Sequence, residues 1–506
     1  MDKSVNYFGK SNTIQALWVG LGSLSSFGLA IISAAILSRY FDKEEYGTYR
    51  QIIYVYSTLL VVFTAGLPRV FGYFLPRYTV EEGKTIVHKI TKLLFFAGMI
   101  FSIFLFLVSN LIADFLNNKE LAYGLKVFSP IPMFLLPTLG LGGIFATYKI
   151  TIYTAIYNTL SRLIMLLFIV VPVIFFKGSY INAIYGWLVA SVITFFIAFF
   201  FKSIPFKKVI KKNTKLTYNE IFNYSIPLVI ASLWGIAIKA SDQFYISRYF
   251  GAEVFAEFSN GFMEIPIVTM VTASASAVLM PVFSKILHEN TEKKELGRVW
   301  KSVLLKSAYI IYPIIVFCLF KAADIIRIIY SDIYIDSTIY FQIRMFLNFF
   351  NIIIFAPLIF AMGETKFYAY VHAFITCLAW LGGYTIVSYF NSPIILAIYS
   401  VSLSIIKILI LFGFIFFKLK FKFSDMIPYK TFFKILCHTT VVIYIIDYVF
   451  DNTISMSNDL MSLLFQCCMY FMIILISSKL IGLEYLMFLK PLIKGKLNFL
   501  KSNNSN

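Results

Sequence analysis

The chain alternates long apolar stretches with short polar connections along almost its whole length. A helix that crosses the hydrocarbon core of a bilayer needs about 20 consecutive apolar residues, and fourteen such windows can be placed in the 506 residues. The windows lie near residues 13–38, 50–75, 93–116, 122–146, 153–176, 182–201, 221–246, 258–283, 303–322, 340–362, 368–390, 394–417, 435–450 and 460–478. This pattern predicts an all-α integral membrane protein with about 14 transmembrane helices.

The polar connections differ in charge between the two sides of the predicted membrane. Connections on the side of both termini contain 30 Lys and Arg residues, against 9 on the opposite side. Cytoplasmic loops are enriched in basic residues, so we expect both termini to lie in the cytoplasm. The first apolar stretch is too long for the core of a signal peptide, so we expect it to be retained as the first helix.

A segment of the first connection recurs in the second half of the chain. Residues 37–49 (LSRYFDKEEYGTY) and 246–258 (ISRYFGAEVFAEF) lie 209 positions apart and share five identical residues. Six predicted helices separate the two copies, so both copies follow helices that cross the bilayer in the same direction. We therefore expect two parallel six-helix lobes, related by a pseudo-two-fold axis along the membrane normal, as in many secondary transporters.

The repeat and the basic loops together predict the domain organisation. The most basic connections are too short to fold as domains of their own, and one of them falls between the two expected lobes. The expected parts are an N-terminal lobe (1–201), a cytoplasmic linker (202–220), a C-terminal lobe (221–417), two further helices (418–478) and a cytoplasmic tail (479–506).

The composition excludes a soluble domain and several kinds of chemistry. The chain is 59% hydrophobic and 14% charged, whereas soluble domains are about 25% charged. Its net charge of +19 is spread over short runs between apolar segments, which indicates membrane lipids, and no nucleic acid, as the partner. The five cysteines lack metal-ligand spacing and no HExxH motif is present. We predict a transporter without catalytic residues, metal or cofactor, and leave open coupling to protons or sodium ions.

Basic residues inside the predicted helices are the candidates for substrate binding. A charged side chain at the centre of a membrane helix costs about 2.5 to 3.5 kcal/mol on insertion scales, so such residues normally face a cavity or a partner. They are Arg69, Lys126, Arg162, Lys239 and Lys407. Four of them fall in the first lobe or the first helix of the second lobe, where a positive cavity would suit a phosphate-bearing substrate. The alternative is that the long side chains reach the headgroups from the helix ends.

Two acidic residues inside the predicted helices are the candidates for ion coupling. Asp242 follows Lys239 by three positions, so the two side chains share a helical face and can pair. Glu264 stands shortly before Pro266, which frees backbone carbonyls that could help to hold an ion. A position of Glu264 at the outer interface is the alternative.

Prolines interrupt the fourth predicted helix. Pro130, Pro132 and Pro137 crowd this window and are followed by three glycines. Proline removes a helical hydrogen bond and clashes with the preceding turn. We therefore expect a broken or kinked helix that permits motion of the lobe.

Local motifs carry a resemblance to a known family. The segment that ends in Tyr46-Gly47-Thr48-Tyr49 after the first helix, the residues Pro281–Lys285 after the eighth and the residues Ala361–Lys366 after the tenth are similar to those of Wzx-type polysaccharide flippases. These belong to the multidrug/oligosaccharidyl-lipid/polysaccharide exporter (MOP) superfamily. The resemblance extends over nearly the whole chain, and the Tyr-Gly-x-Tyr segment is its most specific part.

The resemblance implies a function in the bacterial inner membrane. A V-shaped pair of lobes would move an undecaprenyl-pyrophosphate-linked oligosaccharide from the cytoplasmic to the outer leaflet by alternating access, for O-antigen or capsule synthesis. A polysaccharide polymerase and chain-length proteins would be further partners. The alternatives are a lipid II flippase and a drug or cation antiporter of the same superfamily, the latter with about twelve spans and an acidic cavity. A membrane polysaccharide polymerase or glycosyltransferase would instead need a long outer loop with catalytic residues.

Overall fold

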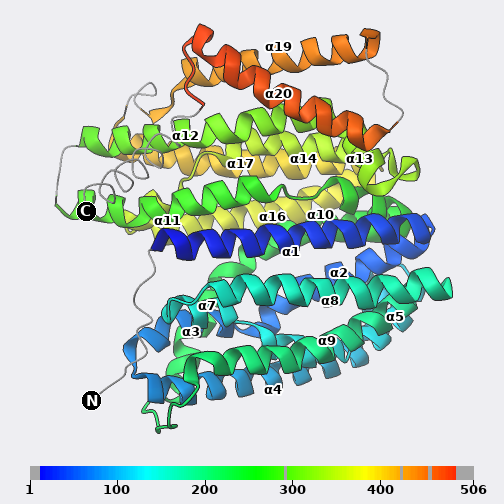
Figure 1. The fold of residues 1–506 in the computed structure, drawn as a ribbon, viewed down its shortest axis with the longest axis vertical. Helices are drawn as coiled ribbons and strands as arrows, with labels where there is room; N and C mark the ends of the chain where they lie inside the picture. The colour runs from blue at the N-terminus through cyan, green and yellow to red at the C-terminus, as the bar shows by residue number, and fades with distance from the viewer. Residues whose placement is uncertain (1–11, 290–292, 422–425, 454–457, 486–506) are drawn as a thin grey trace, which may run out of the picture. The chain divides into compact units, whose positions relative to one another are not determined.

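The computed structural model describes residues 12–289, 293–421, 426–453 and 458–485. These residues are mostly helical, and no strand occurs among them (Figure 1). The predicted all-α fold is confirmed, and the long apolar helices make the chain a multi-pass membrane protein.

The number of membrane-crossing helices is close to the predicted number. Within the described ranges, 11 helices are long and apolar enough to cross a membrane, or up to 13 if two bent helix pairs each count as one span. The window at 340–362 folds instead as two shorter helices, α14 (Ser337–Asn351) and α15 (Ala356–Ala361). A fourteenth crossing at that window stays a prediction.

The chain forms two compact units. The first unit consists of Met1–Ser259, Ile329–Ser331 and Thr376–Leu396. Its helices are α1 (Asn12–Tyr40), α2 (Lys43–Thr64), α3 (Leu67–Phe74), η2 (Leu75–Arg77), α4 (Val80–Phe115), α5 (Glu120–Phe128), α6 (Ile131–Leu135), η3 (Leu136–Thr138), α7 (Leu141–Thr147), α8 (Ile152–Phe176), α9 (Tyr180–Ser203), η4 (Ile204–Phe206) and most of α10 (Tyr218–Gly261). The sequence assigned α10 to the C-terminal lobe, whereas it packs within this unit. The two-lobe division stays a prediction.

The second unit consists of Asn260–Ile328, Asp332–Ile375 and Ala397–Asn506. Its helices are α11 (Pro266–His288), α12 (Lys293–Phe320), most of α13 (Ala322–Tyr330), η5 (Asp332–Tyr334), α14, α15, the start of α16 (Thr365–Tyr389), most of α17 (Pro393–Leu419), α19 (Tyr429–Thr453) and α20 (Asp459–Ile481). Helix α12 packs against α11, α14 and α19, and α19 packs against α20. Helices α19 and α20 correspond to the two extra helices expected after the C-terminal lobe. Most of the tail expected at 479–506 lies outside the described residues.

Small residues let the helices of the first unit approach closely. Helix α8 lies between α1 and α9 (Figure 1). A Cβ atom placed on Gly22 of α1 would lie 2.6 Å from the Cα atom of Ala155 in α8, and one on Gly186 of α9 would lie 1.8 Å from the carbonyl oxygen of Phe168. Small residues permit such backbone contact between membrane helices.

The fourth predicted helix is broken, as its prolines indicate. It is divided into α5, α6, η3 and α7. Gly140 enters α7 with a positive φ of 86°, and a Cβ atom there would lie 2.3 Å from the ring of Phe71. The backbone N–H of Met133, near one of the breaks, donates to the hydroxyl of Ser102 in α4 at 3.1 Å. A side chain of a neighbouring helix thus satisfies a polar group at the interruption.

The residues between α9 and α10 lie along the first turns of α4. The ammonium group of Lys84 donates to the carbonyl of Val209 at 2.9 Å, and Lys89 donates to that of Leu216 at 2.5 Å. The hydroxyl of Thr85 donates to the carbonyl of Lys212 at 2.5 Å. The expected linker is therefore held against α4 by its backbone.

Candidate functional site

The two copies of the repeated segment both form a corner between two helices. In the first copy α1 ends at Tyr40, and the carboxylate of Asp42 caps α2 by accepting the N–H of Glu45 at 2.7 Å. In the second copy α10 passes through Gly251, which has φ 83° and ψ 179°. Glycine adopts such backbone angles without steric cost. The replacement of Asp42 by Gly251 is thus a second way to make the same corner.

The two corners contact each other. A Cβ atom placed on Gly47 would lie 2.0 Å from the carbonyl oxygen of Ala252, so the two backbones touch at this point. The ammonium group of Lys43 lies 2.5 Å from a carboxylate oxygen of Glu257. Only a residue without a side chain permits the approach at position 47, which explains the glycine of the Tyr-Gly-x-Tyr segment.

Buried hydrogen bonds continue the contact along α2 and α10. The amide of Gln51 donates to the hydroxyl of Ser247 at 2.8 Å, and both residues are fully buried. The hydroxyl of Tyr54 donates to the carbonyl of Ala240 at 3.1 Å. We call the contacts of Lys43, Gly47 and Gln51 with the second copy the repeat interface.

Equivalent arginines of the two copies make equivalent hydrogen bonds. Arg39 donates to the carbonyl of Ile329 at 2.6 Å, near the end of α13. Arg248 donates to the carbonyl of Phe115 at 2.5 Å, at the end of α4. The last carbonyls of a helix lack partners within the helix and carry partial negative charge, so a guanidinium group is favourable there. Each arginine thus stabilises the end of another helix.

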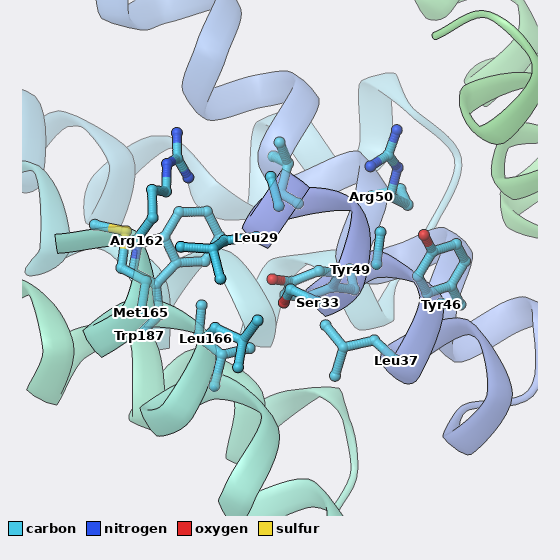
Figure 2. A pocket seen from close by; sticks show the side chains of 14 residues that line it. Leu29, Ser33, Leu37, Tyr46, Tyr49, Arg50, Arg162, Met165, Leu166 and Trp187 are labelled. Atoms are coloured by element: carbon cyan, nitrogen blue, oxygen red, sulfur yellow. The ribbon is translucent and has the colours of Figure 1, made fainter. Parts of the chain in front are cut away.

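A cavity of about 210 Å³ lies in the first unit, between α1, α2, α8 and α9. Its charged lining residues are Arg50 and Arg162, and its aromatic lining includes Tyr49 and Trp187. Figure 2 shows the two arginine side chains at opposite ends of the cavity, with Tyr49 between them. None of the described residues that line it is acidic.

The two arginines are oriented by neutral acceptors. The guanidinium group of Arg162 donates to the hydroxyl of Ser26 in α1 at 3.1 Å. That of Arg50 donates to the carbonyl of Ser259 at 3.1 Å. A guanidinium group carries five N–H donors, so these bonds leave donors for an anion. Planar guanidinium groups match the oxygens of phosphate, and the cavity is therefore suited to a phosphate group.

The five basic residues predicted to bind substrate do not all meet at this cavity. Arg162 lines it. Arg69 is exposed on α3, Lys126 is half-buried on α5, and Lys239 is exposed on α10. Lys407 lies on α17 in the second unit. The substrate-binding role of these residues stays a prediction.

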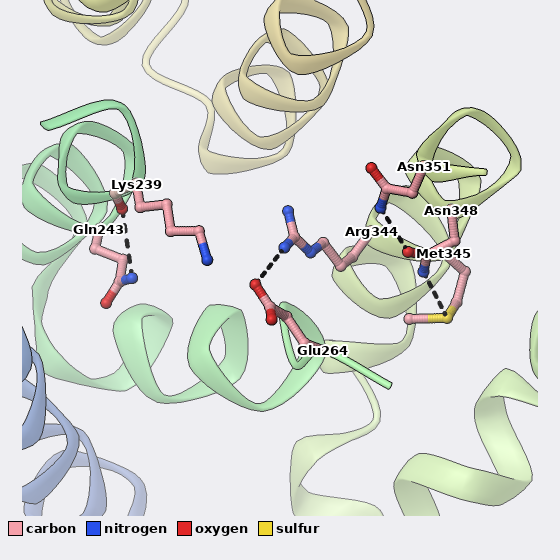
Figure 3. Close-up of polar contacts among 7 residues, drawn as sticks. All are labelled: Lys239, Gln243, Glu264, Arg344, Met345, Asn348 and Asn351. Atoms are coloured by element: carbon pink, nitrogen blue, oxygen red, sulfur yellow. Dashed lines mark hydrogen bonds and ion pairs between the residues drawn. The ribbon is translucent and has the colours of Figure 1, made fainter. Parts of the chain in front are cut away.

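The two predicted coupling residues have different surroundings. Asp242 is buried in α10, and its carboxylate accepts the N–H of Gln243 at 2.7 Å. Glu264 lies 3.1 Å from the guanidinium group of Arg344, and the two side chains point toward each other (Figure 3). Arg344 falls near the start of the window predicted at 340–362 and lies within α14. Ion coupling at either residue stays a prediction.

Arg50 is a lining residue that the sequence reasoning missed. It stands at the first position of the window predicted at 50–75, but α2 begins at Lys43, so Arg50 lies two turns inside the helix. A signal for this start was present. Asp42 with Glu45 three positions later is a recognised pattern for the beginning of a helix.

Comparison with solved structures defines the class of fold. The chain is similar to the lipid II flippase MurJ in its inward closed conformation, at 17% identity and a TM-score of 0.65, over 94% of this chain and 100% of that one. It is similar to a MOP superfamily transporter from Pyrococcus furiosus at 12% identity and a TM-score of 0.58, over 83% and 98%. An inward-facing MATE family transporter matches at 11% identity and a TM-score of 0.60, over 82% and 96%. The fold is that of the MOP superfamily of transporters.

Sequence comparison gives the family. The pattern of the family described as "Polysaccharide biosynthesis protein" matches residues 14–287, more than half of the chain. The chain therefore belongs to the polysaccharide biosynthesis protein family. No curated protein sequence matches it significantly.

Proposed function

We propose that this protein is a flippase for undecaprenyl-pyrophosphate-linked oligosaccharide repeat units of O-antigen or capsule. It moves them from the cytoplasmic to the outer leaflet of the bacterial inner membrane by alternating access. The observation that carries the proposal is a cavity with two guanidinium groups and no acidic side chain among the described lining residues, in a chain of a polysaccharide biosynthesis family with a transporter fold. An antiporter of cationic drugs would need acidic residues there.

The volume of the cavity limits which part of the substrate it can hold. Pockets that enclose a drug-sized ligand have volumes of about 300 to 1,000 Å³, and this cavity has about 210 Å³. We infer that Arg50 and Arg162 hold the pyrophosphate, while the sugars lie elsewhere in the transport path and the prenyl chain stays in the lipid. Arg69, Lys126, Lys239 and Lys407 are proposed as further contacts along that path, and Asp242 and Glu264 as sites of proton or sodium coupling.

The repeat interface gives the proposal a mechanism. With the termini in the cytoplasm, the corners at 37–49 and 246–258 lie at the outer side of the membrane. Their contact then closes the outer end of the path, and parting them opens it. Transport alternates between these two states, and a substrate shifts their populations only through a difference in its affinity for them.

The test is the simultaneous replacement of both cavity arginines. We expect Arg50→Ala with Arg162→Ala to abolish export in a strain that depends on this protein and to cause lipid-linked repeat units to accumulate on the inner leaflet. Arg298→Ala is the matched control, because Arg298 is exposed, pairs with Glu295 and does not line the cavity. Normal export by the double variant would overturn the site.

A lipid II flippase is the second candidate. It is favoured by the similarity to MurJ over 94% of this chain. Growth of cells depleted of their own lipid II flippase, when they express this protein, would support it. Failure to rescue, together with export of repeat units, would favour the first candidate.

A further inference from the structure

A second cavity in the first unit is lined by many basic residues. It has a volume of about 450 Å³ and is lined by the start of α4, the end of α9 and the linker. Its basic lining residues are Lys84, His88, Lys202, Lys207, Lys208 and Lys211. None of the described residues that line it is acidic, and none of them lines the arginine cavity. A cavity with so much unbalanced positive charge indicates an anionic occupant.

Lys202 is the buried member of this group. The sequence placed it in the cytoplasmic linker, but it lies in the last turn of α9 with 4% exposure. Its ammonium group donates to the hydroxyl of Thr91 at 3.1 Å and to the carbonyl of Pro137 at 2.6 Å. It forms no ion pair within the described ranges of the chain, and it lies 5.1 Å from the centre of the Phe71 ring. A buried ammonium is costly without an opposite charge.

The linker fixes the remaining lysines around the cavity. Its backbone is bound to α4 through the carbonyls of Val209 and Lys212, and Lys208 has a positive φ of 66°. A positive φ is uncommon for a residue with a side chain. Lys207, Lys208 and Lys211 are thus positioned by a docked backbone and not by a loose loop.

Exposed aromatic residues of α9 lie beside the cavity. Phe199 lines it and is 42% exposed, and the neighbouring Phe196 and Phe200 are 65% and 58% exposed. The ammonium group of Lys207 lies 5.6 Å from the centre of the Phe200 ring. On a membrane helix such exposed rings contact acyl chains. The site therefore combines a basic cavity with an adjoining lipid-facing surface.

We propose that this cavity binds the phosphate headgroup of an anionic phospholipid, with its acyl chains against Phe199 and Phe200. The predicted orientation places the cavity at the cytoplasmic leaflet, where anionic lipids attract basic groups by about 1 kcal/mol for each Lys or Arg. Basic pockets between membrane helices are a known setting for such headgroups. None of the residues proposed to contact the oligosaccharide lines this cavity, so its test needs no oligosaccharide.

The test measures lipid binding by the purified full-length protein. The protein is titrated in detergent micelles with phosphatidylglycerol, with phosphatidylcholine and with inorganic phosphate, and bound lipid is counted by native mass spectrometry. We expect phosphatidylglycerol to bind selectively and Lys208→Ala with Lys211→Ala to weaken it by about 10- to 30-fold. Lys212→Ala with Lys215→Ala removes the same charge from exposed linker residues that do not line the cavity, and we expect it to bind like the parent protein.

Three results would overturn the proposal. Equal losses in both double variants would show that overall surface charge attracts the lipid. Unchanged lipid binding in the Lys208 and Lys211 variant would show that the cavity is not the lipid-binding site. Binding of inorganic phosphate with no preference between the two lipids would identify a site for a soluble anion instead. Because both double variants change only exposed lysines, a failure to fold does not obscure the result.

Discussion

Replacing Gly47 by alanine should separate the two corners of the repeat interface. The new Cβ atom would lie 2.0 Å from the oxygen and 2.4 Å from the carbon of the Ala252 carbonyl. Non-bonded carbon atoms prefer about 3.5 to 4.0 Å, and both obstructing atoms belong to the backbone, so no side-chain rotation relieves the clash. Extra methyl groups in packed sites cost about 1 to 3 kcal/mol. Such a cost changes a two-state equilibrium by about 5- to 150-fold.

The assay follows the accessibility of a buried position in the interface. Ser247 has 0% exposure, so a cysteine there, in a variant without the native cysteines, is labelled only when the corners part. A membrane-impermeant maleimide is added to intact spheroplasts. Tyr40→Cys, at a position with 52% exposure, reports whether this end faces the outside. We expect Gly47→Ala to raise the labelling of position 247 by about 5- to 150-fold.

A second glycine provides the control for this experiment. Gly28 lies in α1, and a Cβ atom there has no atom within 4 Å. Gly28→Ala should therefore leave the labelling unchanged. If Gly47→Ala is expressed and folded but labels at the parent rate, the contact between the corners does not control access. If both alanine variants raise labelling equally, the effect comes from general loosening of the helices.

Three further predictions follow from the same geometry. Arg39→Ala and Arg248→Ala should raise labelling in that assay by similar factors, because each removes one charge-assisted bond to a helix end. An effect of one variant alone would contradict the equivalence of the two bonds. Gly140→Ala should lower the melting temperature more than Gly363→Ala. Both positions have positive φ, but only the first adds a clash, worth about 1 to 3 kcal/mol. Burial raises the pKa of Tyr148 to about 12. The protonated phenol therefore contributes stability below pH 10, and this stability is lost as the pH rises toward 12. Tyr148→Phe should reduce the loss of stability on alkaline titration, and an unchanged pH profile would contradict this.

The sequence determined the class of this protein and much of its helix pattern. Runs of about 20 apolar residues can be satisfied in a bilayer only as helices, because every backbone polar group must be paired within its own segment. That constraint acts locally, so the windows could be found without knowledge of the fold. The break in the fourth helix was equally predictable, because the effect of Pro132 and Pro137 on a helix is local.

The site depended on contacts that the sequence does not show. Arg162 could be proposed because a charge within an apolar window is conspicuous, but Arg50 lay at the edge of a window and became a lining residue only because α1, α2, α8 and α9 surround one cavity. The sequence pattern placed Lys202 in the linker, whereas the structure shows that it is buried. Whether a charge at the edge of a helix faces water, lipid or a cavity depends on the neighbouring helices.

The repeat shows the same division between sequence and structure. The sequence by itself determined that the chain uses one helix-corner-helix segment twice and that position 47 is a glycine. Only the tertiary structure decided that the two copies meet, with Gly47 against Ala252, and that Arg39 and Arg248 each bind the end of another helix. The physical reason is that these contacts join residues 133 to 290 positions apart, where local propensity carries no information and only the packing of the helices brings the groups together.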